Sequence, residues 1–270
     1  MKRLDQFYTN GDIVDMCLST IDPSVYDMVI EPSAGSGSFY YKIKHKNKIA
    51  LDLDPRFVEC IQMDCLDYRI ECKTYPPNIL TSGNPPFGKN SSLAVKIFNH
   101  FAIMSKTIAF ILPRTFRKPT IINRLHKNFH LETEKILPEK SFHTIDYDLP
   151  KCVKNYDKKY KKLYDVPCVW QVWHKTDKER EKIIVRMEHK DFMFVERKEA
   201  DFLIQRVGGG AGNVSKDMNK KEPAYYNIKA SEEVYNVFKK IDWNKSAKYD
   251  TAGNPSLSKG DIIEMYDRFL

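Results

Sequence analysis

The chain has no long hydrophobic run. Its longest apolar stretches, such as Ile108 to Leu112, cover only a few residues, whereas a membrane-spanning helix needs roughly 20. The first residues are polar and no apolar segment follows them, so we see no secretory signal. These absences predict an intracellular, cytoplasmic protein that does not bind membranes.

Closely paired cysteines are also missing. The six cysteines include no C-x-x-C pair, which is the spacing of most structural zinc sites. We therefore expect free thiols in a reducing compartment and no metal site. His126 and His130 lie four residues apart with no third ligand near them, and we interpret them as a solvated helix face.

The order of apolar segments predicts an α/β fold. Of the 270 residues, 42% are hydrophobic, which suits a folded protein. Strands are expected in the alternating apolar segments at 28–30, 48–52, 61–64, 78–83 and 106–112, and helices at 11–21 and 93–101. This βαβ alternation favours a parallel, Rossmann-like sheet with helices on both faces. Two later segments, 129–137 and 166–173, are also expected to be strands.

A second, smaller module is expected after the sheet. We place a domain boundary at residue 175, which gives a domain over 1–175 and an α+β module over 176–270. The module has a strand-like stretch at 183–195, a triple glycine at 208–210 and short helices near 231–241 and 258–269. The triple glycine suits either a hinge or an anion-binding backbone nest. The module suits target recognition, a nucleic-acid grip or oligomerisation.

Charge is distributed unevenly along the chain. Residues 1–83 carry 9 Lys and Arg against 12 Asp and Glu, a net of −3, and residues 85–164 carry 16 against 6, a net of +10. A basic half beside an acidic half suits an enzyme that binds a polyanion together with a cationic cofactor. A lysine-rich surface without a binding role is the alternative.

A glycine turn follows the first predicted strand. Glu31 leads into Pro-Ser-Ala-Gly-Ser-Gly, and Gly35 and Gly37 have no Cβ to keep a bound nucleoside away from the backbone. A phosphate-binding loop is disfavoured because no G-K-[ST] follows, and the third glycine of a dinucleotide fingerprint is missing. Asp52, at the end of the next strand, can accept hydrogen bonds from two ribose hydroxyls; a turn-capping role is the alternative.

The motif Asn84-Pro85-Pro86-Phe87 ends the strand at 78–83. Two prolines remove two N–H donors, so the Asn84 amide oxygen and the Pro85 carbonyl can both accept hydrogen bonds from one –NH2 group. Two acceptors make a planar amine more electron-rich as it attacks a methyl donor, which stabilises the transition state. Phe87 offers a ring on which a base removed from its stack can rest.

These motifs resemble one family, the class I S-adenosylmethionine-dependent N6-adenine methyltransferases in which the cofactor motifs precede the catalytic motif. The resemblance covers roughly residues 5–175. Gln6-Phe7-Tyr8-Thr9 is similar to the N-terminal cofactor motif, in which the threonine lies near the methionine end of the cofactor. The family usually has proline next, where this chain has Asn10.

The resemblance implies a cofactor, S-adenosylmethionine, and a role for each matching residue. The segment from Glu31 to Gly37, including Ser33 and Gly35, matches the first cofactor motif. Asp52 matches the ribose-binding acid, and Asp64 matches the residue that reaches the cofactor's adenine amino group. Asn84, Pro85, Pro86 and Phe87 match the catalytic motif.

The acceptor is expected to be adenine N6 in nucleic acid, with DNA favoured over RNA because the Gln-Phe-Tyr-Thr opening is more similar to the DNA enzymes. RNA guanine N2 and protein glutamine N5 are alternatives, since related enzymes share the N-P-P-[YF] motif. A catalytically silent, nucleic-acid-binding subunit is the alternative of another class. The candidate phosphate contacts are Arg114, Arg117, Lys118, Lys158, Lys159, Lys161 and Lys162. The sequence predicts no oligomeric state.

Overall fold

The computed structural model describes residues 7–70, 77–144, 162–164, 166–251 and 253–270. These residues form two compact units. The first comprises the chain up to Phe116 together with Thr120–Lys182, and the second comprises Arg117–Pro119 together with Ile183–Leu270.

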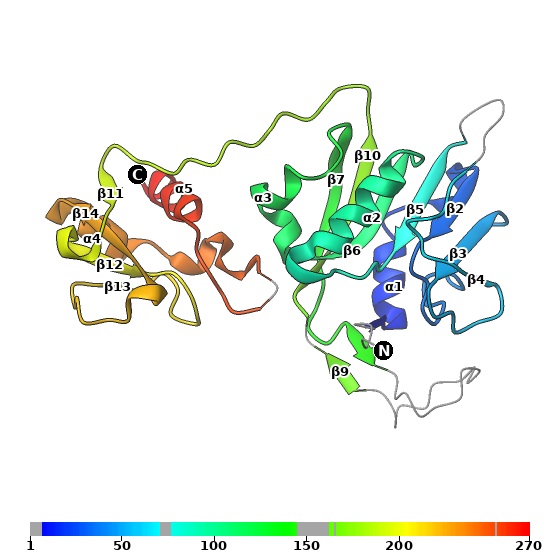
Figure 1. Cartoon of the computed structure of the whole chain (residues 1–270), viewed down its shortest axis with the longest axis horizontal. Helices are drawn as coiled ribbons and strands as arrows, with labels where there is room; N and C mark the ends of the chain where they lie inside the picture. The colour runs from blue at the N-terminus through cyan, green and yellow to red at the C-terminus, as the bar shows by residue number, and fades with distance from the viewer. Residues whose placement is uncertain (1–6, 71–76, 145–161, 165, 252) are drawn as a thin grey trace. The chain divides into compact units, whose positions relative to one another are not determined.

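The first unit is built on a seven-stranded sheet (Figure 1). Its strands, in spatial order, are β4 (Cys60–Gln62), β3 (Lys48–Asp52), β2 (Met28–Glu31), β5 (Ile79–Gly83), β6 (Thr107–Pro113), β10 (Cys168–Lys175) and β7 (Phe129–Ile136). The first five are mutually parallel. β10 runs antiparallel to both of its neighbours. The predicted Rossmann-like sheet is confirmed.

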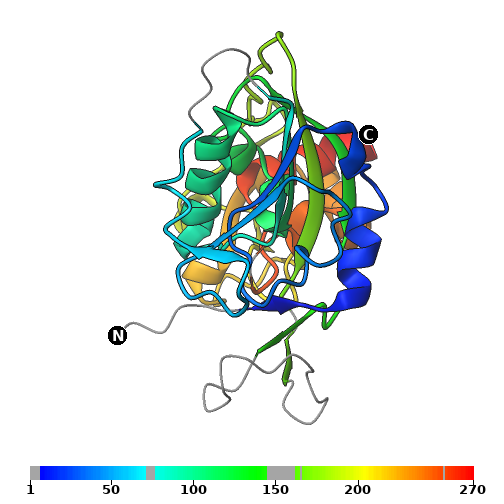
Figure 2. The same ribbon diagram turned by 90° about the vertical axis from the view of Figure 1, so that its right-hand side faces the viewer.

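Helices cover both faces of this sheet, as Figure 2 shows for α1 (Gly11–Leu18) and α2 (Ser92–Ala102). α1 buries Val14 and Cys17 against one face, where Trp170 of β10 also packs. α2 buries Phe98 and five further apolar residues against the other face. All seven residues of β6 are buried, as expected for a strand that helices cover on both sides.

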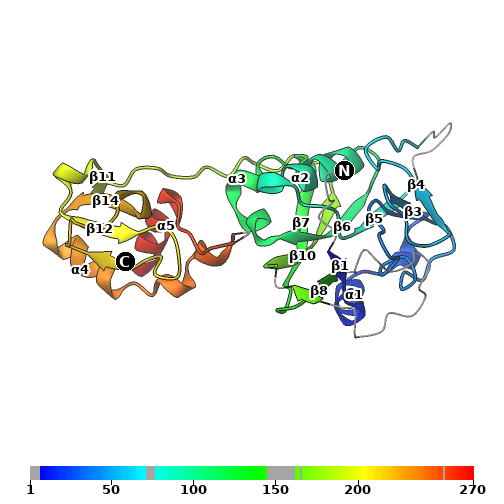
Figure 3. The same cartoon turned by 60° about the horizontal axis from the view of Figure 1, so that its bottom comes forward.

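A small second sheet in the first unit joins a strand near the start of the chain to two later strands. It joins β1 (Tyr8–Thr9), β8 (Phe142–Thr144) and β9 (Lys162–Tyr164), all antiparallel. Figure 3 shows β1 and β8 side by side. The chain reaches β8 after β7 and returns through β9 to β10, and Leu137 N donates to Cys168 O at 3.1 Å where this excursion leaves and rejoins the main sheet.

The second unit is a four-stranded antiparallel sheet with two main helices, which confirms the predicted α+β module. The strand order is β11 (Phe192–Phe194), β14 (Tyr225–Ala230), β12 (Phe202–Gln205) and β13 (Val214–Ser215). Helices α4 (Glu232–Lys240) and α5 (Lys259–Phe269) bury Phe238 and Tyr266 in an apolar core that also contains Phe192, Phe202 and Trp243. α3 (Pro119–Ile122) is a single turn.

Two local predictions were wrong. His126 and His130 do not lie on a helix: His126 precedes β7 and His130 belongs to it, because β7 pairs with β10 along most of its length. Within the strand-like stretch at 183–195, only Phe192–Phe194 forms a strand, since only these residues find a partner, β14.

Two connecting segments make defined contacts. The segment 176–182 is held on the first unit by Arg180, which donates to the carbonyls of Phe129 and Ile122 and lies 5.7 Å from the Trp173 ring centroid. The triple glycine belongs to the β12–β13 connection, where Gly208 N donates to Pro255 O.

The described cysteines are buried free thiols, as expected. They are Cys17, Cys60, Cys65 and Cys168. Burial raises the pKa of Cys17, Cys60 and Cys65 to about 12, so these thiols are unreactive. Among the described residues, His, Cys, Asp and Glu side chains nowhere gather in a group able to hold a metal ion. Of the helices described, none has the length and apolar character needed to cross a membrane.

Candidate active site

The glycine turn begins where β2 ends, at the carboxyl edge of the sheet. Gly35 and Gly37 have φ values of 51° and 84°, which side-chain-bearing residues rarely adopt. A Cβ on Gly35 would lie 2.9 Å from Cε1 of Tyr8. The Tyr8 ring packs directly on the backbone of this turn. Both the positive φ and the closeness of the Tyr8 ring therefore require glycine at position 35.

Asp52 ties this turn to the next strand. Its Oδ2 accepts from Gly35 N at 2.7 Å and its Oδ1 accepts from Asp54 N at 2.8 Å. An ionised carboxylate has about four acceptor positions, so two remain after these bonds. The predicted turn-capping role and the predicted ribose-binding role are therefore compatible in one side chain.

Asp64 lies close to Asp52 because Met63 N donates to Asp52 O at 3.0 Å across the ends of β3 and β4. The Asp64 Oδ1 accepts from Leu66 N at 2.9 Å, which fixes the turn after β4. Ser33 is half-buried and hydrogen-bonds with the Cys65 thiol. Ser33, Asp52 and Asp64 thus lie along the same edge of the sheet.

Glu31 is the most deeply buried acid of the first unit, with 3% of its surface exposed. Burial, and next the negative charge of Asp52, raise the pKa of Glu31 well above its usual range. Its Oε2 has no hydrogen-bond partner among the described residues. A buried acid with an unused oxygen and a negative neighbour favours a cation in this place.

Asn84 follows β5 and hydrogen-bonds to the strand β1. Its Nδ2 donates to Phe7 O at 3.1 Å and to Thr9 Oγ1 at 3.2 Å. Pro85 is buried, and the half-buried Phe87 packs against the apolar clusters of both sheet faces. Both amide hydrogens of Asn84 are used, which leaves its oxygen as the remaining polar atom of the side chain.

The structure brings the separate motifs into one chain of contacts. Asp52 binds the Gly35 amide, and the Tyr8 ring covers Gly35. Thr9, next to Tyr8, binds Asn84. A Cβ on Gly83, the residue before Asn84, would lie 3.2 Å from Cγ of Glu31, and the φ of 150° at Gly83 also suits glycine. Segments that lie far apart in the sequence thus meet at one edge.

The described residues among the predicted phosphate contacts are divided between the two units. Arg114 is half-buried after β6, and its backbone N donates to Pro167 O. Arg117 pairs with Asp250 at 2.6 Å and Lys118 with Asp261 at 3.5 Å, both within the second unit. Lys162 belongs to β9. Lys158, Lys159 and Lys161 lie outside the described residues.

Sequence reasoning missed a polar cluster beside β1. Asn10 Nδ2 donates to Lys140 O at 2.8 Å, and the Asn10 Oδ1 lies 2.8 Å from Nδ1 of His143. The only signal was Asn10 itself, which stands where the family has proline. Nothing in the local sequence connects it to His143, 133 residues away.

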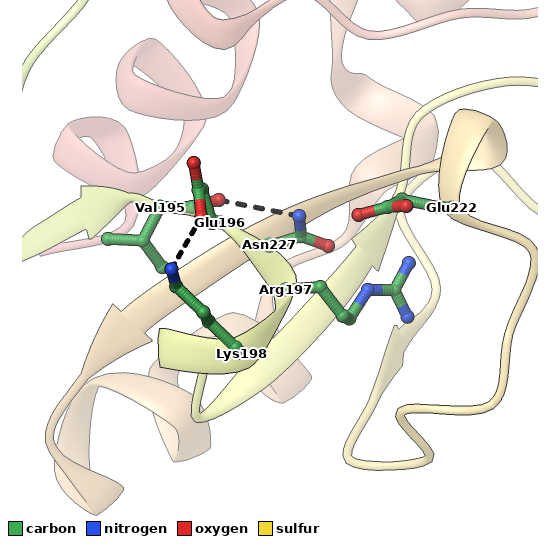
Figure 4. Close-up of a pocket in the computed structure, with 6 residues that line it drawn as sticks. All are labelled: Val195, Glu196, Arg197, Lys198, Glu222 and Asn227. Atoms are coloured by element: carbon green, nitrogen blue, oxygen red, sulfur yellow. Dashed lines mark hydrogen bonds and ion pairs between the residues drawn. The ribbon is translucent and has the colours of Figure 1, made fainter.

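The second unit carries a separate groove of about 560 Å³ (Figure 4). Lys198 and Glu196 pair at 3.1 Å, and Asn227 Nδ2 donates to Val195 O at 3.3 Å. Two acids and two bases balance its charge, which gives no preference for a phosphate group. Its lining residues are Val195, Glu196, Arg197, Lys198, Glu222 and Asn227.

Comparison with known proteins gives likenesses of fold. No protein-family model matches the chain, and no curated protein sequence matches it. A modification subunit of a putative type I restriction enzyme from Vibrio vulnificus is similar at 16% identity and a TM-score of 0.44, over 63% of this chain and 44% of that one. A putative RNA methyltransferase from Pyrococcus horikoshii is similar at 15% identity and a TM-score of 0.44, over 64% and 88%.

A third structure, a putative class I S-adenosylmethionine-dependent methyltransferase from Listeria monocytogenes, is similar at 11% identity and a TM-score of 0.42, over 65% of this chain and 64% of that one. The match spans less than half of the length of the restriction-enzyme subunit. At these identities the chain is similar to the three proteins in fold alone.

Proposed function

We propose that the chain transfers a methyl group from S-adenosylmethionine to the exocyclic N6 of adenine in nucleic acid, with DNA as the favoured acceptor. The observation that carries this proposal is the chain of contacts from Asp52 through Gly35, Tyr8 and Thr9 to Asn84. It supports the proposal because the Asp52 carboxylate and the Asn84 amide lie at the same edge of the sheet, and each keeps an oxygen that can accept further hydrogen bonds.

The described residues fit the proposed cofactor. Asp52 keeps acceptor positions for the two ribose hydroxyls, and the positive φ values of Gly35 and Gly37 allow the tight turn that brings the Gly35 amide to Asp52. The unused Glu31 oxygen suits the positively charged amino-acid end. When bound, S-adenosylmethionine supplies an electrophilic methyl group on a positively charged sulfur.

The chain's own contribution to the reaction is orientation and hydrogen bonding. The Asn84 oxygen and the Pro85 carbonyl accept the two hydrogens of the target amine, which draws its lone pair out of the ring and toward the methyl carbon. The cofactor, when bound, would supply the methyl group and would leave as a neutral thioether, and the methylated amine would release one proton to solvent. Phe87 offers a ring edge on which the base can rest.

The similar proteins support nucleic acid as the acceptor class only by analogy, since one is a modification subunit of a putative restriction enzyme and another is a putative RNA methyltransferase. The net charge of +10 over residues 85–164 adds an argument from this chain, because phosphate contacts contribute much of nucleic-acid affinity. DNA remains the favoured acceptor on the opening motif alone.

The test is to incubate the protein with methyl-labelled cofactor and, separately, single-stranded DNA, duplex DNA, RNA and a protein extract, then to digest and identify the modified unit. We expect N6-methyladenine, and we expect Asn84→Ala to abolish it while calorimetry shows cofactor binding unchanged. Label on guanine N2 or glutamine would reassign the acceptor. Absence of cofactor binding in the intact protein would indicate a silent, nucleic-acid-binding subunit.

A further inference from the structure

The direction in which the Asn84 side chain points is set by β1. The Phe7 carbonyl oxygen can only accept a hydrogen bond, so the Asn84 atom 3.1 Å from it must be the amino nitrogen. The Thr9 hydroxyl accepts the other amide hydrogen at 3.2 Å. Asn84 cannot turn its amide over without opposing two oxygens, and the oxygen therefore faces away from β1.

β1 is a very short strand. It is two residues long and, within the described part of the chain, pairs with β8 through Tyr8 opposite His143 and Thr9 opposite Phe142. A pairing this short is marginal without further contacts. Yet Thr9 is 4% exposed and Tyr8 is 7% exposed, so β1 is well buried. Contacts beyond the strand pairing must therefore stabilise its position.

Asn10 supplies those groups. Its backbone N donates to Ser141 O at 3.0 Å, and its Nδ2 donates to Lys140 O at 2.8 Å. Because the Nδ2 faces a carbonyl, the Oδ1 faces His143, and His143 Nδ1 donates to it at 2.8 Å. The His143 ring is 3% exposed, and its centroid lies 6.0 Å from that of Tyr8. One residue, through its backbone and its side chain, thus joins the end of β1 to Lys140, Ser141 and His143, in β8 and just before it.

Proline at position 10 could make none of these three bonds, since it has no N–H and no polar side chain. This chain therefore holds β1 through hydrogen bonds of Asn10, at the position where the family it resembles has proline. Asn10 has φ −65°, a value that proline also adopts, and its carbonyl accepts from Val14 N whichever residue is present. Asn10→Pro is consequently a substitution that removes the three bonds and leaves the local backbone conformation possible.

We propose that Asn10 and His143 are positioning residues: they latch β1 onto β8 and so hold Phe7 and Thr9 where these orient the Asn84 amide oxygen toward the target amine. The proposal rests on the methyltransferase function proposed above. Neither residue belongs to the residues proposed to bind the cofactor or the acceptor. Their effect reaches the reaction through β1 and the direction of the Asn84 side chain.

The test compares the wild type with Asn10→Pro, Asn10→Ala, His143→Ala and His143→Asn. The asparagine amide nitrogen can replace the Nδ1 donor of His143, and alanine cannot. Asp12→Asn, two residues further along in the exposed first turn of α1, is the matched control. Turnover, acceptor KM and cofactor affinity are measured well below the melting temperature of the weakest variant.

We expect kcat to fall about 10- to 100-fold in both Asn10 variants and in His143→Ala, since a catalytic group displaced by about 1 Å loses up to that factor. Cofactor affinity should fall by a smaller factor than kcat, because Asp52 is untouched whereas Tyr8 and Thr9, which match the N-terminal cofactor motif, belong to β1 itself. His143→Asn should recover most of the lost kcat. An unchanged kcat in Asn10→Pro, or equal losses in His143→Asn and His143→Ala, would overturn the proposal.

A second readout needs no turnover. The side-chain amide resonances of Asn84, assigned by their loss in Asn84→Asp, report its two hydrogen bonds directly. They should shift in Asn10→Pro and His143→Ala and stay in place in Asp12→Asn; resonances that do not move would refute the latch. If they shift as expected but the wild type methylates no substrate, the proposed function fails while the orientation of Asn84 by β1 stands.

Discussion

Removal of the Asp52 carboxylate should weaken cofactor binding and loosen the glycine turn together. Asp52 accepts from Gly35 N and Asp54 N at 2.7 and 2.8 Å and keeps two positions for ribose hydroxyls. A hydrogen bond to a charged group contributes about 1.5 kcal/mol at the lower end. Two such bonds to the ribose make Asp52→Ala bind S-adenosylmethionine roughly 100-fold more weakly.

The same substitution leaves two backbone N–H groups without their acceptor. At about 1 kcal/mol each, this lowers the melting temperature by about 4 to 8 °C. Calorimetric titration and thermal unfolding measure the two effects separately. Asp54→Asn is the control. It removes a neighbouring carboxylate that pairs with Arg56 at 2.6 Å, and it keeps the Asp52 carboxylate in place. Wild-type affinity in Asp52→Ala, or an equal loss in Asp54→Asn, would refute the reasoning.

Three further predictions follow from burial and backbone geometry. The folded protein favours protonated Glu31, so ionisation of this side chain costs stability as the pH rises. Glu31→Gln should therefore raise the melting temperature in mildly alkaline buffer, and should raise it by less in mildly acidic buffer. Ionised Glu31 favours a cation, so wild-type cofactor affinity should increase with pH, and calorimetry on Glu31→Gln should show a flatter dependence; parallel curves would contradict this role. Gly35→Ala, at φ 51° and with its Cβ 2.9 Å from the Tyr8 ring, should cost at least about 1 kcal/mol of unfolding free energy and weaken cofactor binding, as denaturant melts and titration would show. Phe98→Ala, which empties a buried position between Phe129 and Trp173, should cost about 3 to 5 kcal/mol in the same melts without altering cofactor affinity of the folded fraction.

The parts of the fold that could be predicted are those that local pattern determines. The apolar segment of β6 is buried on both faces and reads as a strand without knowledge of its neighbours. α1 shows Ile13, Val14 and Cys17 on one face, and the structure buries those three residues. In both cases the burial pattern can be recognised from residues that lie close together in the sequence.

The parts that could not be predicted depend on distant partners. β1 is too short to show any periodicity, and it exists because β8 pairs with it. The strand over 129–137 was predicted, and the helical interpretation of the spacing between His126 and His130 was wrong because His130 belongs to that strand, which pairs with β10. For the site, the motifs identified Asp52 and Asn84, but the bonds from Asn84 to Phe7 and Thr9 arise only in three dimensions.

The excursion between β7 and β10 leaves the seven-stranded sheet and returns to it at one edge. Leu137 N donates to Cys168 O next to the paired strands β7 and β10, at the edge where β5 ends and Asn84 follows. The entropy of closing such a connection grows only slowly with its length. The segment could therefore be lengthened or exchanged as a unit, as long as β8 still pairs with β1. For the proposed methyltransferase, this would allow a change of acceptor without a change in the seven-stranded sheet.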